Sequence, residues 1–322
     1  MQNYFLKRAK TLTFACLFLL ISVFSVSGQS MFRKILDFDG DSKADFAVVR
    51  SENNLKFWYV WQSTAGFRAI QWGLATDSAA AGDYDGDGKT DFAVYRRQQI
   101  PSSNTERHDF YILQSSNNLF VSKSFTAIRG FFYNAHQQDY DGDGKTDPAV
   151  AISYEVYYGE FILQSSNNTL RTTGHGYLEG SIKIGDMDGD GNAESAARSF
   201  NNNNIVKWTN LTTGNTRSIN FGVPEDVFFT ADFDGDGKGD LTVWRRSEGN
   251  WYWLRSSDNV LYGMHWGLPD DVPVPADYDG DGCTDQAVYR RGSPNGIYYI
   301  NGSQSGFRAF VWGSPNDFPV MY

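Results

Sequence analysis

Acidic residues in this chain are concentrated in one nine-residue pattern that occurs six times. Each copy has carboxylates at positions 1, 3, 5 and 9 and a glycine at position 4, and the copies begin at Asp37, Asp83, Asp139, Asp186, Asp232 and Asp277. Together the six loops hold 24 of the 38 acidic residues. Alternating carboxylates on a tightly turned backbone point inward, which is how proteins surround a hard cation with oxygen atoms.

The number of oxygen donors in each loop favours calcium, since magnesium prefers fewer protein ligands and keeps its water. Positions 1, 3, 5 and 9 would bind through carboxylates and position 7 through its main-chain carbonyl. About six ions are expected, and the predicted ligands are Asp37, Asp39, Asp41, Lys43, Asp45, Asp83, Asp85, Asp87, Lys89, Asp91, Asp139, Asp141, Asp143, Lys145, Asp147, Asp186, Asp188, Asp190, Asn192, Glu194, Asp232, Asp234, Asp236, Lys238, Asp240, Asp277, Asp279, Asp281, Cys283 and Asp285.

Three loops depart from the common pattern. The first has Ser42 at position 6, where the others have the glycine that a sharp turn requires, so we expect the first site to be the weakest. The fourth has Glu194 at position 9. The sixth has Cys283 at position 7, where we expect binding through the backbone oxygen only, because soft sulfur selects other metals.

Short strands must position these loops. The loops recur every 45 to 56 residues, and a Gly, as in Trp72-Gly73 and Trp266-Gly267, stands ten residues before four of them. Each repeat contains four apolar runs bounded by Ser, Asn, Asp and Gly, which predicts four strands joined by hairpins. Four antiparallel strands per unit of this length predict an all-β fold, a β-propeller of six four-stranded blades.

The end of the chain adds part of another repeat. Residues 314–322 match 268–276 and stop one residue before the next loop would begin. Because 31–36 already offer an inner strand for the first blade, 317–322 is expected to be a surplus strand, with one terminus closing the ring against the other. A seven-bladed ring completed by a partner chain is the alternative.

An aromatic-Gly pair, ten residues, the acidic loop and a short apolar strand such as 92–95 together resemble the FG-GAP repeat of integrin α-subunits and the VCBS-type repeat of bacterial exported proteins. The resemblance covers 32–322, and the bacterial form is closest, because Arg pairs such as Arg96-Arg97 stand where integrins carry Gly-Ala-Pro. It implies calcium loops between the first and second strands of each blade, and adhesion, carbohydrate binding or scaffolding as the function.

The N-terminus indicates export. Lys7, Arg8 and Lys10 precede a 15-residue apolar stretch and the small residues Ser27 and Gly28. This predicts a signal peptide at 1–28 and one propeller domain at 29–322, in a protein that is secreted, periplasmic or at the cell surface. The stretch is too short for a typical membrane span, so none is expected in the mature chain. Removal of the signal peptide, with its three positive charges, would change the net charge of the chain from −10 to −13, and six divalent ions would nearly cancel this charge.

The expected function is binding without catalysis. The acidic balance excludes a nucleic-acid partner, and no zinc-protease, nucleophile-elbow or phosphate-loop motif occurs. A glycan or a cell-surface protein is the expected partner, at the face opposite the loops. That face carries an insertion at 98–108, and the candidate ligand-binding residues are Trp72, Arg107, His108, Trp266 and Trp312. A structural spacer without ligand and an enzyme like a polysaccharide lyase are the alternatives.

Overall fold

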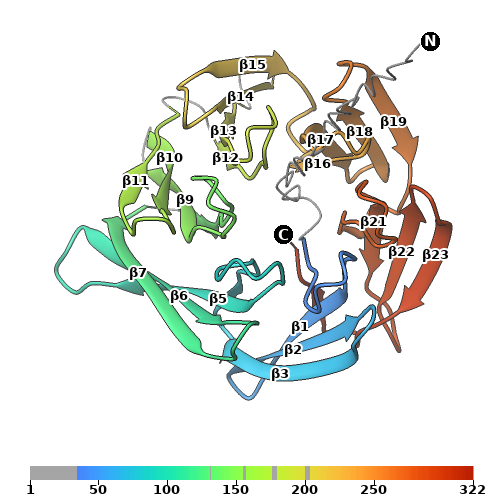
Figure 1. Ribbon diagram of the computed structural model, residues 1–322, viewed down its shortest axis with the longest axis horizontal. Coiled ribbons are helices and arrows are strands. Elements are labelled where there is room, and N and C mark those ends of the chain that lie inside the picture. Colours follow the sequence, from blue (N-terminus) through green and yellow to red (C-terminus); the bar gives the residue numbers. More distant parts are fainter. Residues whose placement is uncertain (1–34, 131, 155–156, 176–179, 200–203, 322) are drawn as a thin grey trace, which may run out of the picture.

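The protein forms a ring of six four-stranded antiparallel sheets (Figure 1). The computed structural model describes residues 35–321 except 131, 155–156, 176–179 and 200–203. Within these residues all regular elements are strands, as the alternating runs predict. The described residues include no helix of the length and hydrophobicity that a membrane span requires. The all-β, six-bladed prediction is therefore confirmed, and the seven-bladed alternative is wrong; the predicted signal peptide lies outside the described residues.

Each blade is one sheet whose strands follow the chain from the centre of the ring outward, apart from the innermost strand of blade 1. Blade 1 contains β24 (Phe318–Pro319), β1 (Phe46–Glu52), β2 (Leu55–Gln62) and β3 (Gly66–Leu74). Blade 2 contains β4 (Ser78–Ala79), β5 (Phe92–Gln99), β6 (Thr105–Leu113) and β7 (Phe120–Ile128). Blade 3 contains β8 (Phe132–Ala135), β9 (Ala149–Tyr154), β10 (Tyr157–Leu163) and β11 (Leu170–Thr172).

The second half of the ring repeats this order. Blade 4 contains β12 (Gly180–Ile182), β13 (Ser195–Arg198), β14 (Ile205–Thr209) and β15 (Thr216–Asn220). Blade 5 contains β16 (Val227–Ala231), β17 (Asp240–Arg245), β18 (Asn250–Leu254) and β19 (Leu261–His265). Blade 6 contains β20 (Val272–Pro273), β21 (Gln286–Arg290), β22 (Ile297–Gly302) and β23 (Gly306–Val311). Every acidic loop precedes the second strand of its blade, as expected.

The closure of the ring differs from the sequence prediction. Residues 31–34 lie outside the described part, and Ile35 and Leu36 form a turn. The inner strand of blade 1 is β24, which pairs with β1 through Val48↔Pro319 and Val49↔Phe318. The C-terminal segment is therefore an integral strand, and its prediction as surplus is wrong. The expectation that one terminus closes the ring against the other is confirmed.

The acidic loops form a second ring of contacts. The N–H at position 8 of each loop donates to the carbonyl at position 1 of the preceding loop, with N···O distances of 2.6 to 2.7 Å. The last of these bonds runs from Ala44 of the first loop to Asp277 of the sixth. Each loop is therefore held against both of its neighbours in the ring, independently of β24.

The insertion in blade 2 is an extended hairpin. Strands β5 and β6 remain paired as far as Gln99↔Glu106, and residues 100–104 connect them beyond the ends of the neighbouring hairpins (teal in Figure 1). The predicted position of the surplus, between the second and third strands, is confirmed. The hairpin extends from the end of the blade opposite the acidic loop, because those loops precede the second strands.

Candidate functional site

The first carboxylate of each acidic loop organises its turn. In the second loop, Asp83 accepts hydrogen bonds from the N–H of Gly86 at 2.7 Å and of Gly88 at 3.0 Å. The residue at position 6 has a positive φ in all six loops, 87° at Gly88 and 68° at Ser42. Glycine adopts this conformation without strain, so its place in five loops is explained and Ser42 is confirmed as a strained exception.

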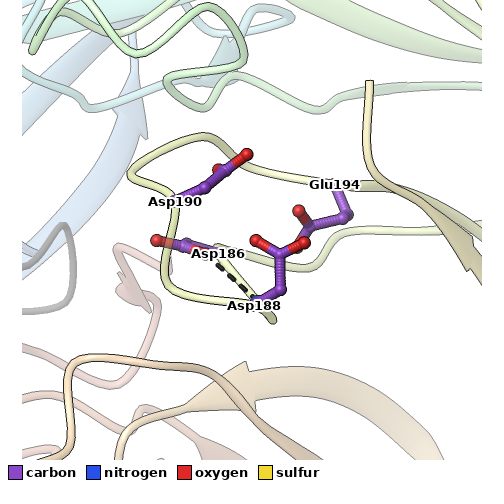
Figure 2. Close-up of side chains that lie close together, drawn as sticks. All are labelled: Asp186, Asp188, Asp190 and Glu194. Atoms are coloured by element: carbon purple, nitrogen blue, oxygen red, sulfur yellow. Dashed lines mark hydrogen bonds between the residues drawn. The ribbon is translucent and has the colours of Figure 1, made fainter. Parts of the chain in front are cut away.

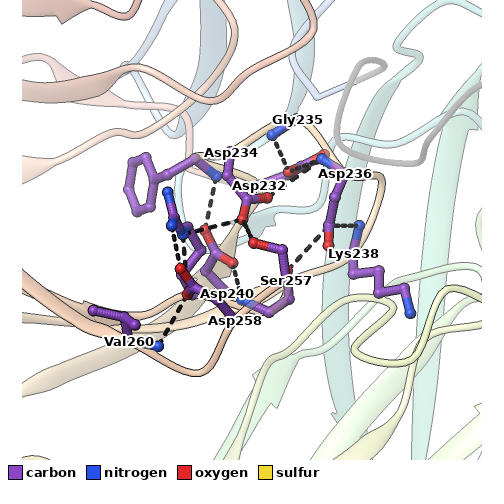
Figure 3. Close-up of polar contacts among 12 residues, drawn as sticks. Asp232, Asp234, Gly235, Asp236, Lys238, Asp240, Ser257, Asp258 and Val260 are labelled. Carbon is purple, nitrogen blue, oxygen red and sulfur yellow. Dashed lines mark hydrogen bonds and ion pairs between the residues drawn. The ribbon is translucent and has the colours of Figure 1, made fainter.

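The carboxylates at positions 1, 3 and 9 converge in the first three loops, with one oxygen of each lying within 4.8 Å of the others. In the fourth loop position 5 joins them, and Figure 2 shows Asp186, Asp188, Asp190 and Glu194 arranged around one space. In the fifth loop the group comprises Asp232, Asp234 and Asp236 (Figure 3). The structure therefore brings together most of the predicted carboxylate ligands, whereas position 5 of the first three loops lies outside the group.

The electrostatics of these loops fit a divalent cation. Burial raises the pKa of Asp45 to about 8, of Asp91 to about 7 and of Glu194 to about 8, in each case with a further increase from neighbouring carboxylates. One buried oxygen of Asp39 and one of Asp141 have no hydrogen-bond partner among the described residues. Buried carboxylate oxygens without a donor are costly, and a cation at the centre of the loop would compensate them.

The side chains at position 7 point away from their own loops. Lys89 fills the space that a Cβ would occupy at Gly40 of the preceding loop, and the corresponding residue does so at the position-4 glycine of every loop. Cys283 lies in this way against Gly235, and burial raises the pKa of its thiol to about 11. A thiolate ligand is therefore disfavoured at Cys283, in agreement with the prediction.

The turn between the third and fourth strands of a blade also contacts the acidic loop, which was not predicted from the sequence. In blade 2, Ser115 donates through its hydroxyl to Asp87 at 2.9 Å and through its N–H to Asp91 at 2.6 Å, and Ser116 donates to Asp85 at 2.6 Å. Serines of blades 1, 3, 5 and 6 make equivalent bonds. The repeated Gln-Ser-Ser-Asn-Asn at 114–118 and 164–168 was the available signal.

Comparison with known families agrees with this geometry. Residues 37–94, which contain the first two loops and the strands between them, match the FG-GAP-like repeat. The propeller therefore contains an FG-GAP-like repeat at 37–94. The other four loops have the same spacing of carboxylates and the same place before a second strand.

The comparisons with individual proteins add only general likeness. No curated protein matches the chain. Among solved structures, apo AztD from Citrobacter koseri is 10% identical, with 86% of this chain and 96% of that chain covered and a TM-score of 0.47. An auxiliary nutrient binding protein from Bacteroides ovatus is 11% identical over 80% of this chain and 71% of that chain, with a TM-score of 0.43.

The aromatic-glycine pairs join neighbouring blades. The indole N–H groups of Trp72, Trp266 and Trp312 donate to carbonyls in the third strand of the next blade, at 2.9, 3.2 and 3.3 Å. The following glycine has a positive φ, and at Gly73 a Cβ would collide with Val94 of the next blade. These three Trp side chains are only partly buried, but their polar atoms are engaged in packing between blades.

The other two candidate ligand-binding residues lie on opposite faces of β6. His108 has no exposed surface and its Nδ1 lies 2.8 Å from the hydroxyl of Tyr95. Arg107 is half exposed and forms an ion pair with Asp109 at 3.0 Å. The structure therefore does not bring the five candidates together, and it leaves His108 without access to a ligand.

A cavity of about 470 Å³ lies beside the extended hairpin instead, lined by Arg97, Gln99, Asn104, Glu106, Ile128, Arg129 and Gly130. Glu106 is 1% exposed, and its carboxylate lies 3.9 Å from the Arg97 guanidinium and 3.7 Å from that of Arg129. The Oε2 atom of Glu106 has no hydrogen-bond partner within the described part of the chain. Two guanidinium groups and one carboxylate therefore meet in a concave site. The sequence predicted a binding site in this hairpin but selected Arg107 and His108 in place of Arg97, Glu106 and Arg129.

Proposed function

We propose that the protein is an exported, calcium-loaded β-propeller that binds an acidic carbohydrate beside its extended hairpin, without catalysis. The observation that supports calcium is the convergence of carboxylates in the loops, where buried oxygens of Asp39, Asp141 and Asp279 have no donor among the residues that the structure describes. Oxygen donors in this number suit calcium better than any softer metal. The predicted signal peptide supports export.

Calcium binding to the folded state alone would stabilise it by mass action, by about 2.7 kcal/mol for one site at a hundredfold excess over its dissociation constant. Thermal unfolding in excess calcium and in excess chelator should therefore differ strongly. Asp85→Asn should reduce this difference, whereas Asp270→Asn, at a fully exposed side chain outside the loops, should not. Coincident melting curves in calcium and chelator would reject calcium as the resident ion.

The cavity beside the hairpin supports the proposed ligand. Arg97 and Arg129 give it a local excess of positive charge in an acidic protein, and Gln99 and Asn104 add amide groups that can bond sugar hydroxyls. Guanidinium groups bind carboxylates in paired geometry, so a glycan with uronic acid units fits this set. Ile128 contributes an exposed apolar surface against which a sugar ring can pack.

A glycan array probed with the calcium-loaded protein tests this ligand. We expect acidic glycans to bind, and we expect Arg129→Ala to weaken binding at least tenfold. Arg246→Ala is the matched control, because Arg246 is the second residue of the Arg pair in blade 5 as Arg97 is in blade 2, and its side chain is 64% exposed. Binding that survives Arg129→Ala would place the site elsewhere. Absence of binding to every glycan would favour a spacer, and cleavage of a bound glycan would favour a lyase.

A further inference from the structure

The outermost strand of blade 2 lacks a long polar side chain that the other five blades carry at one position. Strand pairing aligns this position across the ring. The residue is an arginine in four blades and a tyrosine in blade 5, namely Arg68, Arg171, Arg217, Arg308 and Tyr262. In blade 2 it is Val121, which pairs with Ile112 of the third strand.

The interface between blades 1 and 2 shows what the arginine contacts. The Arg68 guanidinium lies 4.8 Å from the centre of the Phe92 ring of blade 2 and donates to the Asn118 side chain of the same blade at 3.2 Å. Phe92 directly follows the second acidic loop, and Asn118 belongs to the turn before the fourth strand. The space between these two blades is therefore occupied by a guanidinium that stacks on an aromatic ring.

Between blades 2 and 3, which are adjacent in the ring (Figure 1), both members of this stack are replaced by smaller residues. Val121 stands in place of Arg68, and Pro148, which follows the third acidic loop, stands in place of Phe92. A cavity of about 260 Å³ lies here, at the loop end of the two blades. The apolar part of its lining consists of Ile112, Val121, Pro148 and Leu163.

A cation has moved along the same strand to the lining of this cavity. Lys123 lies two residues after Val121, on the same face of β7, where blades 1 and 4 have Ile70 and Ile219. Its ammonium donates to Asn168 at 2.5 Å, the residue of blade 3 that corresponds to the asparagine bound by the arginine of blade 1. The polar contact between blades is therefore kept, but a lysine makes it from farther along the strand and leaves the cavity beside it.

The polar lining of the cavity is rich in hydrogen-bond donors. Lys145 joins Lys123, so two ammonium groups outnumber the single carboxylate, Asp85, which already accepts a serine hydroxyl at 2.6 Å. Gln114 and Gln164 also line the cavity, and their side-chain oxygens accept hydrogen bonds within their own turns at 3.4 and 3.0 Å. Their amide N–H groups are therefore the part that can bind a ligand. Donors and positive charge above an apolar floor favour an anionic group on an apolar body.

We propose that the cavity between blades 2 and 3 binds a small carboxylic acid with a compact apolar body. At about 30 Å³ for each water-sized unit, its volume holds about nine non-hydrogen atoms. The carboxylate would pair with the Lys123 ammonium and the glutamine N–H groups, while the apolar body would contact Val121, Pro148 and Leu163. This site lies beside the acidic loops, whereas the extended hairpin leaves the opposite end of blade 2, so it is separate from the proposed glycan site.

Equilibrium dialysis with labelled benzoate tests the site, because benzoate is of this size and joins one carboxylate to an apolar ring. We expect saturable binding of one equivalent in excess calcium, and at least tenfold weaker binding of benzamide, which is neutral, and of acetate, which lacks the ring. Lys123→Ile introduces the residue type of blades 1 and 4 and should weaken benzoate binding at least tenfold. The matched control, Arg217→Gln, removes an exposed positive charge from the outermost strand of blade 4 and should leave binding unchanged.

A second variant closes the cavity with residues that the ring already packs elsewhere. The triple substitution Val121→Arg, Lys123→Ile and Pro148→Phe reproduces the interface between blades 1 and 2 and keeps the net charge. We expect it to fold, because it fills a cavity with an existing type of contact, and to lose benzoate binding. If it does not fold, Lys123→Ile decides alone. The proposal is overturned if the unaltered protein shows no saturable benzoate binding, if benzamide binds equally well, or if the folded triple variant still binds benzoate.

Discussion

Arg50 of blade 1 donates from Nε and Nη2 to the two carboxylate oxygens of Asp317, 267 residues later in the chain, at 2.6 and 2.9 Å. The same pair recurs within the chain, as in Arg290 with Asp271 at 2.8 and 2.8 Å. In each case the Asp also accepts the N–H of the residue after the glycine of the aromatic-glycine pair. Ring closure therefore uses the contact that joins ordinary neighbouring blades.

Arg50→Met should destabilise the ring, because it leaves the fully buried carboxylate of Asp317 without its cation. Loss of one partner of a buried pair costs about 3 kcal/mol or more. The matched control is Arg290→Met, which breaks the same pair where the chain is continuous. Denaturant unfolding should give similar losses for both variants, but only Arg50→Met should accelerate hydrogen exchange in β24. Equal exchange of β24 in the two variants would contradict this role in closure.

Ser42→Gly should strengthen the first calcium site. Ser42 has a φ of 68°, a conformation that costs a non-glycine residue on the order of 1 kcal/mol, so relief of this strain should raise affinity about fivefold. Gly88→Ser is the reciprocal control, since nothing lies within 4 Å of a Cβ at Gly88 and only backbone strain would be added. Calorimetric titration that finds no change in either loop would contradict the strained-turn explanation.

Arg255→Gln should strengthen the fifth calcium site. The Arg255 guanidinium lies 3.5 Å from Asp234 and also pairs with Asp258, so a positive charge of the chain stands beside a proposed calcium ligand. Gln62 and Gln114 occupy the corresponding position before the serine turn in the first two blades. Calcium titration should show a gain of several-fold for Arg255→Gln that diminishes at high salt. Arg246→Gln serves as the control for the loss of a positive charge in the same blade, and a gain in both variants would indicate only a net-charge effect.

His108 should make the folded protein sensitive to acid. Burial lowers the pKa of His108 to about 4, with a smaller decrease from the charge of Arg97. In the unfolded chain this histidine has a pKa of about 6.5, so as the pH falls the unfolded state takes up the proton before the folded state does. The contribution of neutral His108 to the free energy of unfolding is therefore fully present above pH 6.5, the pKa of the unfolded state, and is lost as the pH falls toward about 4.

His108→Gln keeps a hydrogen-bonding group near Tyr95 but does not titrate. Relative to the unaltered protein, this variant should gain up to about 3 kcal/mol of folding free energy between pH 7.5 and pH 4.5, given 1.36 kcal/mol per pKa unit. Chemical unfolding in saturating calcium at both pH values measures the gain. His265→Gln controls for the loss of one histidine, and parallel pH profiles for His108→Gln and the unaltered protein would contradict the prediction.

The repeated carboxylates and apolar runs were sufficient to predict the blades, the place of the loops and the position of the extended hairpin, because period-two alternation and turn residues are local properties of a sequence. The inner strand of blade 1 could not be predicted from local sequence, because it comes from the other end of the chain. Residues 31–36 have strand-like composition, whereas 318–319 pair with β1 because Asp317 follows Gly313 at the spacing that Asp77 has from Gly73. That spacing was the available signal.

The residues of the candidate sites were predicted less completely. Arg107 and His108 were selected because they lie in the insertion, but β6 turns them to opposite faces and buries His108. Glu106, one residue earlier, lines the cavity and was not selected. The buried Glu160 in the third strand of blade 3 was also not predicted, although strand pairing places it where Trp58 and Trp251 stand in blades 1 and 5. Burial of a charge at an aromatic position becomes visible only when the third strands are compared across blades.

The ring of hydrogen bonds between the acidic loops has no terminal link. Structures that end in an open edge fray from that edge, because its last bond breaks without disturbing others. Here the bond from Ala44 to Asp277 has the same length, within 0.1 Å, as the bonds within the continuous chain, so every loop is an interior one. Local opening of any one loop must therefore break two of these hydrogen bonds, one to each neighbouring loop.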